Sequence, residues 1–217
     1  MNNISIALGV MNRTDRIVKC LSSWCSYDVF DDIVIVDWSS STPIMQNDEV
    51  KAFVSSVNNI SIIRVDNKQY FSQSSAYNIA VDNCKNKHIL KLDIDHILIN
   101  KNLPNLFNDL IPSLSSKFYC CEHVTVEHWG ICFFDKDAFY QVGKYNEKLS
   151  GWGYDDQDFY HRLSKIREKN IMRQIPHLIY HNPHGDDLRV ANYKIKDKFE
   201  SNRRNELISK GLIDYQE

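Results

Sequence analysis

Asp93 and Asp95 flank a single isoleucine directly after the apolar run 89–92. Because side chains alternate along an extended segment, both carboxylates point to the same side of the chain. Paired carboxylates suit a hard divalent cation that also binds diphosphate oxygens. A solvated pair of aspartates at the end of a strand would give the same pattern, so the motif alone indicates a metal site without establishing it.

A second group of candidate ligands lies near the C-terminus, where His181 and His184 flank Asn182-Pro183. Proline favours a loop over a helix here. Two neutral imidazoles together with one carboxylate make a good site for a first-row metal, with room left for a diphosphate. We interpret these two histidines as metal ligands and the nearby His177 as a surface residue, although a histidine-rich surface turn remains the alternative.

The densest constellation is the run 151–158, Gly-Trp-Gly-Tyr-Asp-Asp-Gln-Asp. Glycine permits positive φ and a close approach of ligand, and Trp152 offers a flat apolar face for a sugar ring. Asp155 and Asp156 fall in the first turn of an expected helix, where the helix dipole favours carboxylates. Helix capping explains one of these acids. The other fits a general base that accepts a proton from a hydroxyl nucleophile.

The elements that must position these residues follow from hydrophobic patterning. Apolar runs predict strands over 4–10, 33–36, 60–65 and 88–92, and helical spacing predicts helices after residue 14, over 49–57 and up to residue 84. This alternation implies a parallel sheet covered by helices, in which ligands bind beyond the carboxyl ends of the strands. Asp37 and the pair Asp93 and Asp95 lie at such ends.

Beyond residue 100 the pattern is less regular. We expect a strand over 131–134, a helix over 135–142, a turn over 151–154 and a helix beginning at Asp155. A weakly amphipathic helix is predicted over 192–210.

The composition fits one folded domain. Hydrophobic residues make up 43% of the 217 residues and charged residues 25%, which allows a buried core. The formal net charge of −2 argues against nucleic-acid binding, which usually needs a basic surface. The 6 cysteines form no Cys-x-x-Cys pair, so we expect buried thiols in a reducing compartment.

Targeting signals are not expected. The N-terminal residues have no basic region or cleavage site, and no apolar run reaches the roughly 18 residues of a membrane span. We therefore predict a cytoplasmic protein without a signal peptide, and we leave open a peripheral association with the inner face of a membrane.

The segment 130–163 contains Gly-Ile-Cys-Phe-Phe-Asp-Lys-Asp-Ala-Phe, then Val-Gly-Lys-Tyr-Asn-Glu, then Gly-Trp-Gly-Tyr-Asp-Asp-Gln-Asp-Phe-Tyr-His-Arg-Leu. This ordered run resembles the C-terminal region of the β1,4-galactosyltransferase family and of related bacterial capsule and chondroitin-polymerase glycosyltransferases. The segments 12–13, 36–37, 75–78 and 92–95 are similar to the nucleotide-binding half of the same GT-A fold. The resemblance covers roughly residues 4–187.

The resemblance implies an inverting transfer in which Asp156 is the base that takes the acceptor proton. It implies that Mn²⁺, or Mg²⁺, is bound by Asp95, His181 and His184. The donor-binding residues that it implies are Asn12, Arg13, Asp37, Ser39, Asn78 and Asp93. The acceptor-binding residues that it implies are Trp152, Gly153 and Asp155.

This chain departs from the family pattern on the acceptor side. Tyr154 replaces a glycine, Asp155 replaces a glutamate, and Gln157 replaces an acid.

These observations predict an α/β chain with a GT-A fold, that is, a mostly parallel central sheet flanked by helices, with a C-terminal helical tail. We expect a glycosyltransferase domain over 1–187, with a nucleotide-binding half at about 1–100 and an acceptor-binding half at about 101–187, and an extension over 188–217. The predicted reaction moves galactose or N-acetylgalactosamine from a UDP-sugar to a glycan or glycolipid acceptor, in bacterial polysaccharide biosynthesis. The alternatives are a catalytically silent module that binds sugar nucleotides and a metal-dependent nucleotidyltransferase or phosphohydrolase.

Overall fold

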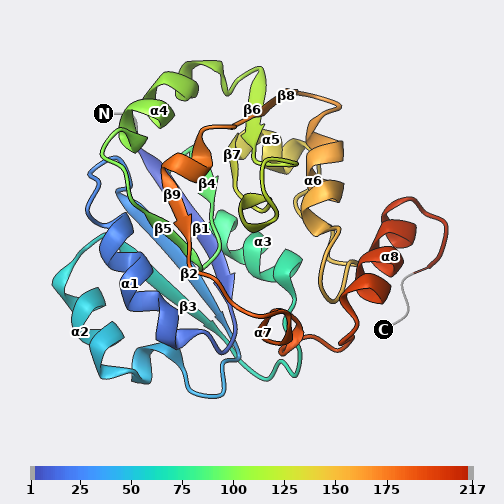
Figure 1. The fold of residues 1–217 in the computed structure, drawn as a ribbon, viewed down its shortest axis with the longest axis horizontal. Helices are drawn as coiled ribbons and strands as arrows, with labels where there is room; N and C mark the ends of the chain where they lie inside the picture. Colours follow the sequence, from blue (N-terminus) through green and yellow to red (C-terminus); the bar gives the residue numbers. More distant parts are fainter. Residues whose placement is uncertain (1–2, 215–217) are drawn as a thin grey trace.

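The computed structural model describes residues 3–214, and of Asp186 and Arg189 only the backbone. The last three residues of the predicted extension 188–217 lie outside the described residues. A seven-stranded mixed sheet crosses the molecule in the order β3-β2-β1-β4-β7-β6-β8 (Figure 1). Its strands are β1 Ile4–Val10, β2 Asp32–Trp38, β3 Ile60–Val65, β4 His88–Lys91, β6 Lys117–Cys120, β7 Cys132–Asp135 and β8 Glu168–Ile171.

The N-terminal half of the sheet is parallel, as predicted. Strand β1 pairs in parallel with β2 and β4, and β2 pairs in parallel with β3. Strand β7 runs antiparallel to β4 and to β6, whereas β8 is parallel to β6. Strands β1 and β2 are almost completely buried, which explains their continuous apolar sequences.

A small antiparallel sheet of β5 (His96–Leu98) and β9 (Ile179–His181) was not predicted from the sequence. Its register places His96 opposite His181. The sheet thereby brings the segment after β4 next to the histidine-containing loop, although the two are far apart in the chain.

The helices are α1 Thr14–Trp24, α2 Asp48–Ser56, α3 Gln73–Asn83, α4 Leu103–Leu110, α5 Lys136–Gln141, α6 Asp155–Leu163, α7 Asp186–Val190 and α8 Lys198–Ser209. Short 3-10 turns are η1 Ile44–Gln46, η2 Ile111–Ser113, η3 Val126–His128 and η4 Ile175–His177. None of the helices within residues 3–214 has the length and apolar character needed to span a bilayer.

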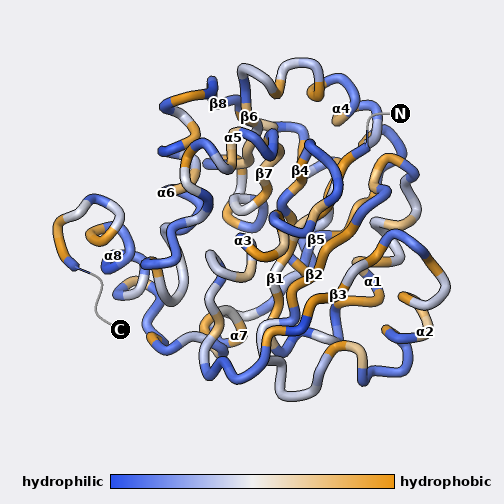
Figure 2. The backbone as a smooth tube through the Cα atoms, turned by 180° about the vertical axis from the view of Figure 1, so that it is seen from behind, coloured by the Kyte–Doolittle hydropathy of each residue, from blue (hydrophilic) through white to orange (hydrophobic). Residues whose placement is uncertain are grey.

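Helix α3 packs against β1 and β2 at very short range. A Cβ atom at Gly9 would lie 2.4 Å from the Cβ of Ala76, so only glycine allows this approach. The hydrophobic stretches concentrate in the central strands (Figure 2). The core therefore holds the carboxyl ends of β1 and β4 in fixed positions.

The predicted helix over 192–210 begins later than expected. Helix α8 starts at Lys198, because the Asp197 side chain caps it by accepting hydrogen bonds from the backbone N–H groups of Phe199 and Glu200. The preceding residues instead form α7 and an irregular segment, so the prediction was wrong for 192–197.

Candidate active site

A cavity of about 410 Å³ opens at the carboxyl ends of β1 and β4. Strand β1 lies between β2 and β4, so this position is the switch point of the parallel half of the sheet, where α/β proteins bind ligands. The predicted site residues that line the cavity are Arg13, Asp93, Asp95, Trp152, Gly153, Asp155, Asp156, His181 and His184. The fold thus brings the three motifs together in one place.

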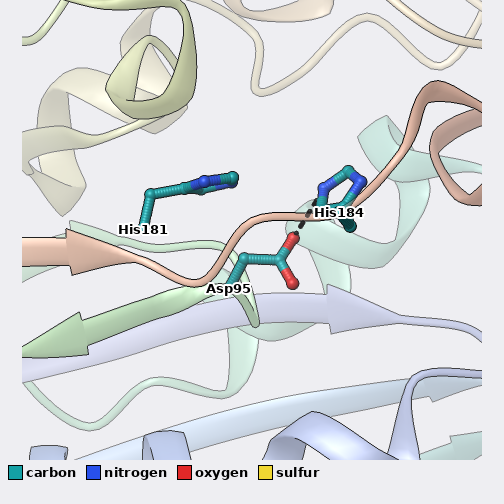
Figure 3. Close-up of side chains that lie close together, drawn as sticks. All are labelled: Asp95, His181 and His184. Carbon is teal, nitrogen blue, oxygen red and sulfur yellow. Dashed lines mark ion pairs between the residues drawn. The ribbon is translucent and has the colours of Figure 1, made fainter.

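Asp95, His181 and His184 direct one carboxylate and two imidazoles towards a common point (Figure 3). One ligand atom from each residue lies within 4.8 Å of the others. His184 Nε2 is 3.1 Å from Asp95 Oδ2. His181 is the last residue of β9, and His184 lies in the loop that follows.

The protonation states of this cluster suit a metal. Burial alone would raise the pKa of Asp95, but the hydrogen bond and charge of His184, with the charge of Arg13, lower it below its usual value. Burial lowers the pKa of His181. A carboxylate and a neutral imidazole are the forms that bind cations, and this donor set fits a first-row divalent ion such as Mn²⁺.

Arg16 fixes the position of the Asp95 carboxylate. Its Nη1 donates to Asp95 Oδ1 at 3.0 Å and to the carbonyl oxygen of Asn182 at 2.8 Å. One guanidinium therefore ties α1 to Asp95 and to the loop between His181 and His184, while Asp95 Oδ2 stays directed at His184.

His96 holds the segment that carries the aspartate pair. The Asp93 backbone N–H donates to His96 Nδ1 at 3.0 Å, so Nε2 carries the ring proton and donates to the Glu127 carbonyl oxygen at 3.0 Å. Burial lowers the pKa of His96 to about 4, which keeps the ring neutral. This histidine is a support for the cluster, and its fixed tautomer orients the loop after β4.

The turn before α6 has an unusual backbone. Gly151 and Gly153 have φ values of 88° and 92°, and Tyr154 has a φ of 67°. The left-handed conformation favours glycine and costs other residues on the order of 1–3 kcal/mol. This turn directs the first residues of α6, Asp155 and Asp156, into the cavity.

Asp156 is held through one of its carboxylate oxygens. Oδ1 lies 3.0 Å from Lys91 Nζ and accepts a hydrogen bond from the Tyr145 hydroxyl at 3.3 Å. Burial raises the pKa of Asp156, and the charge of Lys91 opposes this increase. A partly buried carboxylate of raised basicity is what general-base chemistry requires.

Asp155 is buried beside Asp156, and its Oδ2 has no hydrogen-bond partner among residues 3–214. Burial and the negative charge of Asp156 raise the pKa of Asp155 well above its usual value. The raised pKa favours the protonated form of Asp155 at neutral pH.

We expect the Asp155→Asn variant to be more stable than the unmodified chain at alkaline pH. An acid whose pKa rises on folding binds more protons in the folded chain than in the unfolded chain. The wild-type free energy of unfolding therefore falls as pH rises from about 4 towards the raised pKa. Asparagine removes this loss, which we place at about 1–3 kcal/mol. Melting temperatures between pH 5 and 9 test this, at about 2–4 °C per kcal/mol, and a difference that does not grow with pH would contradict it.

Four predicted donor-binding residues lie outside the lining of the cavity among the described residues: Asn12, Asp37, Ser39 and Asn78. Asn78 accepts a hydrogen bond from the Tyr145 N–H at 2.9 Å and donates to the Tyr145 carbonyl oxygen at 3.0 Å. It therefore fixes the loop that carries Tyr145. A contact of these four residues with a donor stays a prediction.

Asn12 and Ser39 connect loops beside the cavity. Asn12 Oδ1 accepts from the Ser41 N–H at 2.7 Å, and its Nδ2 donates to Asn192 at 2.9 Å. The Ser39 hydroxyl donates to the Val65 carbonyl oxygen at 2.8 Å. Both residues have positive φ, at 57° and 52°, which marks tight turns.

Asp37 is buried and has a full set of partners. Its Oδ1 accepts from the Ser40 N–H at 3.1 Å, and its Oδ2 accepts from the Ile44 N–H at 2.9 Å and from Arg64 Nη1 at 2.8 Å. This carboxylate holds the loop after β2.

We expect Asp37→Ala to act mainly on stability, with a loss on the order of 1.5–3 kcal/mol, because hydrogen bonds to a charged group are broken. Thermal unfolding measures this loss. Donor KM, determined below the melting temperature, separates this loop role from the predicted donor contact, since it should change little if the carboxylate serves the loop alone. An Asp37→Ala variant of normal stability with a strongly raised donor KM would instead place the carboxylate on the nucleotide.

Sequence reasoning missed two residues that contact the acids of the cavity, Lys91 beside Asp93 and Asp156, and Tyr77 beside Asp93. Lys91 is buried in β4 and donates to the Gly130 carbonyl oxygen at 2.8 Å. The Tyr77 hydroxyl donates to Asp93 Oδ1. A lysine within the apolar run 89–92 was the available signal, since lysine is almost never fully buried unless it is paired.

The C-terminal tail packs on the turn before α6, and in Figure 1 α8 lies beside this loop. Asn205 Nδ2 donates to the Gly153 carbonyl oxygen at 2.8 Å, and its Oδ1 accepts from the Ser150 N–H at 3.1 Å. The Ser209 hydroxyl donates to Asp158 Oδ1 at 2.6 Å. The tail is therefore part of the support of the site.

Comparison with protein families gives a match over part of the chain. The family described as the N-terminal domain of galactosyltransferase matches residues 115–182. This region contains the turn, α6, β9 and His181. No curated protein matches the sequence.

Solved structures share the fold at low sequence identity. The mannosyltransferase PcManGT from Pyrobaculum calidifontis, in complex with GDP-Man and Mn²⁺, is 14% identical with a TM-score of 0.63, over 78% of this chain and 54% of that one. TarS 1-349 from S. aureus is 12% identical with a TM-score of 0.66, over 92% of this chain and 68% of that one. The same TarS fragment has been solved with UDP.

The chain spans about half the length of the mannosyltransferase, 54%, and 41% of the longer TarS chain. These similarities show that it has the GT-A fold. The family match over residues 115–182 agrees with this fold.

Proposed function

We propose that this chain is a metal-dependent inverting glycosyltransferase that moves a sugar from a nucleotide-sugar donor to an acceptor hydroxyl. The observation that carries the proposal is the shared cavity. A candidate cation cluster, Asp95 with His181 and His184, and a partly buried carboxylate of raised pKa, Asp156, line the same space at the switch point of the sheet.

The cation cluster is the part of the cavity that suits the diphosphate of the donor. It supplies one carboxylate and two imidazoles, which leaves coordination positions for phosphate oxygens. When bound, a divalent cation neutralises negative charge on the leaving diphosphate. Arg13 also lines the cavity, and its positive charge acts on Asp95.

Asp156, which also lines the cavity, accepts the proton of the acceptor hydroxyl. The acceptor oxygen forms a bond to the anomeric carbon while the bond from that carbon to the diphosphate oxygen breaks. The electron pair of the broken bond leaves with the nucleoside diphosphate. The attack comes from the face opposite the leaving group, which inverts the anomeric configuration. General-base assistance of this kind contributes about 10²–10⁴-fold.

The turn before α6 is the proposed acceptor side. Trp152 and Gly153 line the cavity next to Asp155, whose Oδ2 is buried without a partner among the described residues. An acceptor hydroxyl donating to this oxygen would satisfy it. We propose a glycan or glycolipid acceptor in bacterial polysaccharide biosynthesis, and a UDP-sugar donor, with galactose or N-acetylgalactosamine as the first candidates.

The test is a panel of UDP- and GDP-sugars incubated with the protein and Mn²⁺, with and without acceptor sugars, in which released nucleoside diphosphate is measured. We expect release that depends on acceptor and metal, and a product of inverted anomeric configuration by NMR. GDP-mannose belongs in the panel because a similar structure binds it. Donor binding without release would indicate a silent binding module, and release of nucleoside monophosphate would indicate a phosphohydrolase.

A further inference from the structure

Lys91 is a buried cation next to two acids that line the cavity, Asp93 and Asp156. It lies at the end of β4 with only 1% of its surface exposed. Its Nζ is 3.0 Å from Asp156 Oδ1, 3.7 Å from Asp93 Oδ1 and 4.4 Å from the centre of the Tyr77 ring. Lys91 takes no part in the bond changes of the proposed transfer.

A charged lysine at this position is costly. Removing an ammonium group from water costs several kcal/mol, and packing alone would be served as well by an apolar side chain of similar volume. Both carboxylates near Lys91 line the cavity. Its charge is therefore placed where it acts on the site.

We infer that Lys91 is a positioning residue that holds the proposed base, Asp156, by one carboxylate oxygen and keeps it ionised, so that the other oxygen meets the acceptor hydroxyl. The inference rests on the proposed function. Its geometric basis is that Lys91 and Tyr145 both contact Oδ1. Among the hydrogen bonds described for residues 3–214, Oδ2 has none, and Asp156 lines the cavity.

The space around this arrangement is tight. A Cβ atom at Gly130 would lie 3.0 Å from Lys91 Nζ, 2.8 Å from Asp93 Oδ2 and 3.2 Å from Asp156 Oδ2. Because residue 130 is glycine, Lys91 can reach both acids. Its Nζ also donates to the carbonyl oxygen of Gly130. The network therefore connects the base with the donor-side Asp93.

The surroundings of Asp156 would otherwise favour its protonated form. The charged groups that face it are Lys91 and Asp93 from β4 and the loop after it, and Asp155 from α6. The neutral titratable groups that face it are Tyr77, Cys120, Cys132, Tyr145, Tyr160 and Tyr193. Among the described residues, Lys91 is the positively charged group in direct contact with the carboxylate.

The test is the pH profile of kcat/KM for Lys91→Met. Loss of a contacting opposite charge should move the acid limb of the profile up by about 1–3 pH units. Activity at neutral pH should then fall roughly tenfold to hundredfold and recover as the pH rises, since the base titrates later. A purely structural role would lower activity at every pH and leave the limb in place.

Two further variants control for folding. Lys91→Arg keeps the charge, so its acid limb should stay near the wild-type position even if its kcat falls. Tyr145→Phe removes a neutral hydrogen bond from the same oxygen and should shift the limb less than Lys91→Met. If Lys91→Met does not fold, the Lys91→Arg profile decides. An acid limb at the same pH as in the wild type supports the inference, and an acid limb shifted to higher pH overturns it.

A readout independent of turnover separates this inference from the proposed function. The side-chain ¹³C signal of Asp156, titrated by NMR in the wild type and in Lys91→Met, reports the same shift even if no donor is turned over. A wild-type enzyme that transfers sugar while both profiles coincide would overturn the role of Lys91 alone. Absence of transfer with a shifted titration would overturn the proposed function alone.

Discussion

Replacing Asp156 with asparagine is expected to lower kcat by about 10²-fold or more. Asparagine keeps the shape of the side chain and an acceptor for Lys91 and Tyr145, but it cannot take the proton of the acceptor hydroxyl. The cation cluster and Arg13 are separate groups in the cavity. Binding of the nucleotide with Mn²⁺ should therefore persist, and calorimetry beside steady-state kinetics measures both quantities.

Asp158→Asn is the matched control on the same helix. Asp158 is buried, lies outside the cavity lining among the described residues, and pairs with Arg162 at 2.6 Å. Its replacement should lower the melting temperature and leave kcat near the wild-type value. If both acids merely stabilise the start of α6, the two variants should instead resemble each other, with stability losses of roughly 1 kcal/mol and normal turnover. A folded Asp156→Asn enzyme of nearly full activity would remove the assignment.

Much of the sheet could be predicted because its strands are continuous apolar runs. The predicted strands 4–10 and 60–65 have the observed bounds of β1 and β3. The short strands β5 and β9 could not be predicted, because each contributes three residues and their pairing joins distant parts of the chain. Local patterns carry no information about such a pairing.

The candidate site follows the same division. Its motifs stand out in the sequence because acidic residues lie close together, as in Asp93 with Asp95 or the acids after Trp152. The residues that hold these acids in position do not stand out in the sequence. Arg16 reaches Asp95 from α1, and the ring of His96 is fixed by the Asp93 N–H and the Glu127 carbonyl oxygen. Only folding brings these groups together, so single-sequence reasoning finds the reacting groups more readily than the groups that orient them.

Asp37 and Asn78 show how one sequence pattern can serve two roles. Both are polar residues at places where a donor site was expected, and both have their side chains occupied by loops of the protein itself. A polar residue near the end of a strand can be there to satisfy the backbone of the following turn. Spacing alone does not separate this role from ligand binding.

Removing the Asp95 carboxylate is expected to lower activity by about 10²–10³-fold, because metal stabilisation of the leaving group supplies several kcal/mol. Asp95→Asn retains an oxygen that can accept from Arg16, so the support of the loop should survive. The variant should bind Mn²⁺ weakly in the presence of UDP, as measured by calorimetry. His184→Ala should behave in the same way, because His184 Nε2 faces Asp95 Oδ2 at 3.1 Å.

His177→Ala is the matched control for the histidine variants. His177 is exposed in η4 and is not part of the cation cluster found among the described residues. Its loss should leave both Mn²⁺ binding and turnover unchanged. Treatment with EDTA should abolish wild-type turnover and Mn²⁺ should restore it, whereas Asp95→Asn should regain little at any practical Mn²⁺ concentration. Full donor turnover in EDTA would contradict a metal at Asp95, His181 and His184, and so would equal effects of His177→Ala and His184→Ala. Arg13 would then be the group that neutralises the negative charge of the leaving diphosphate.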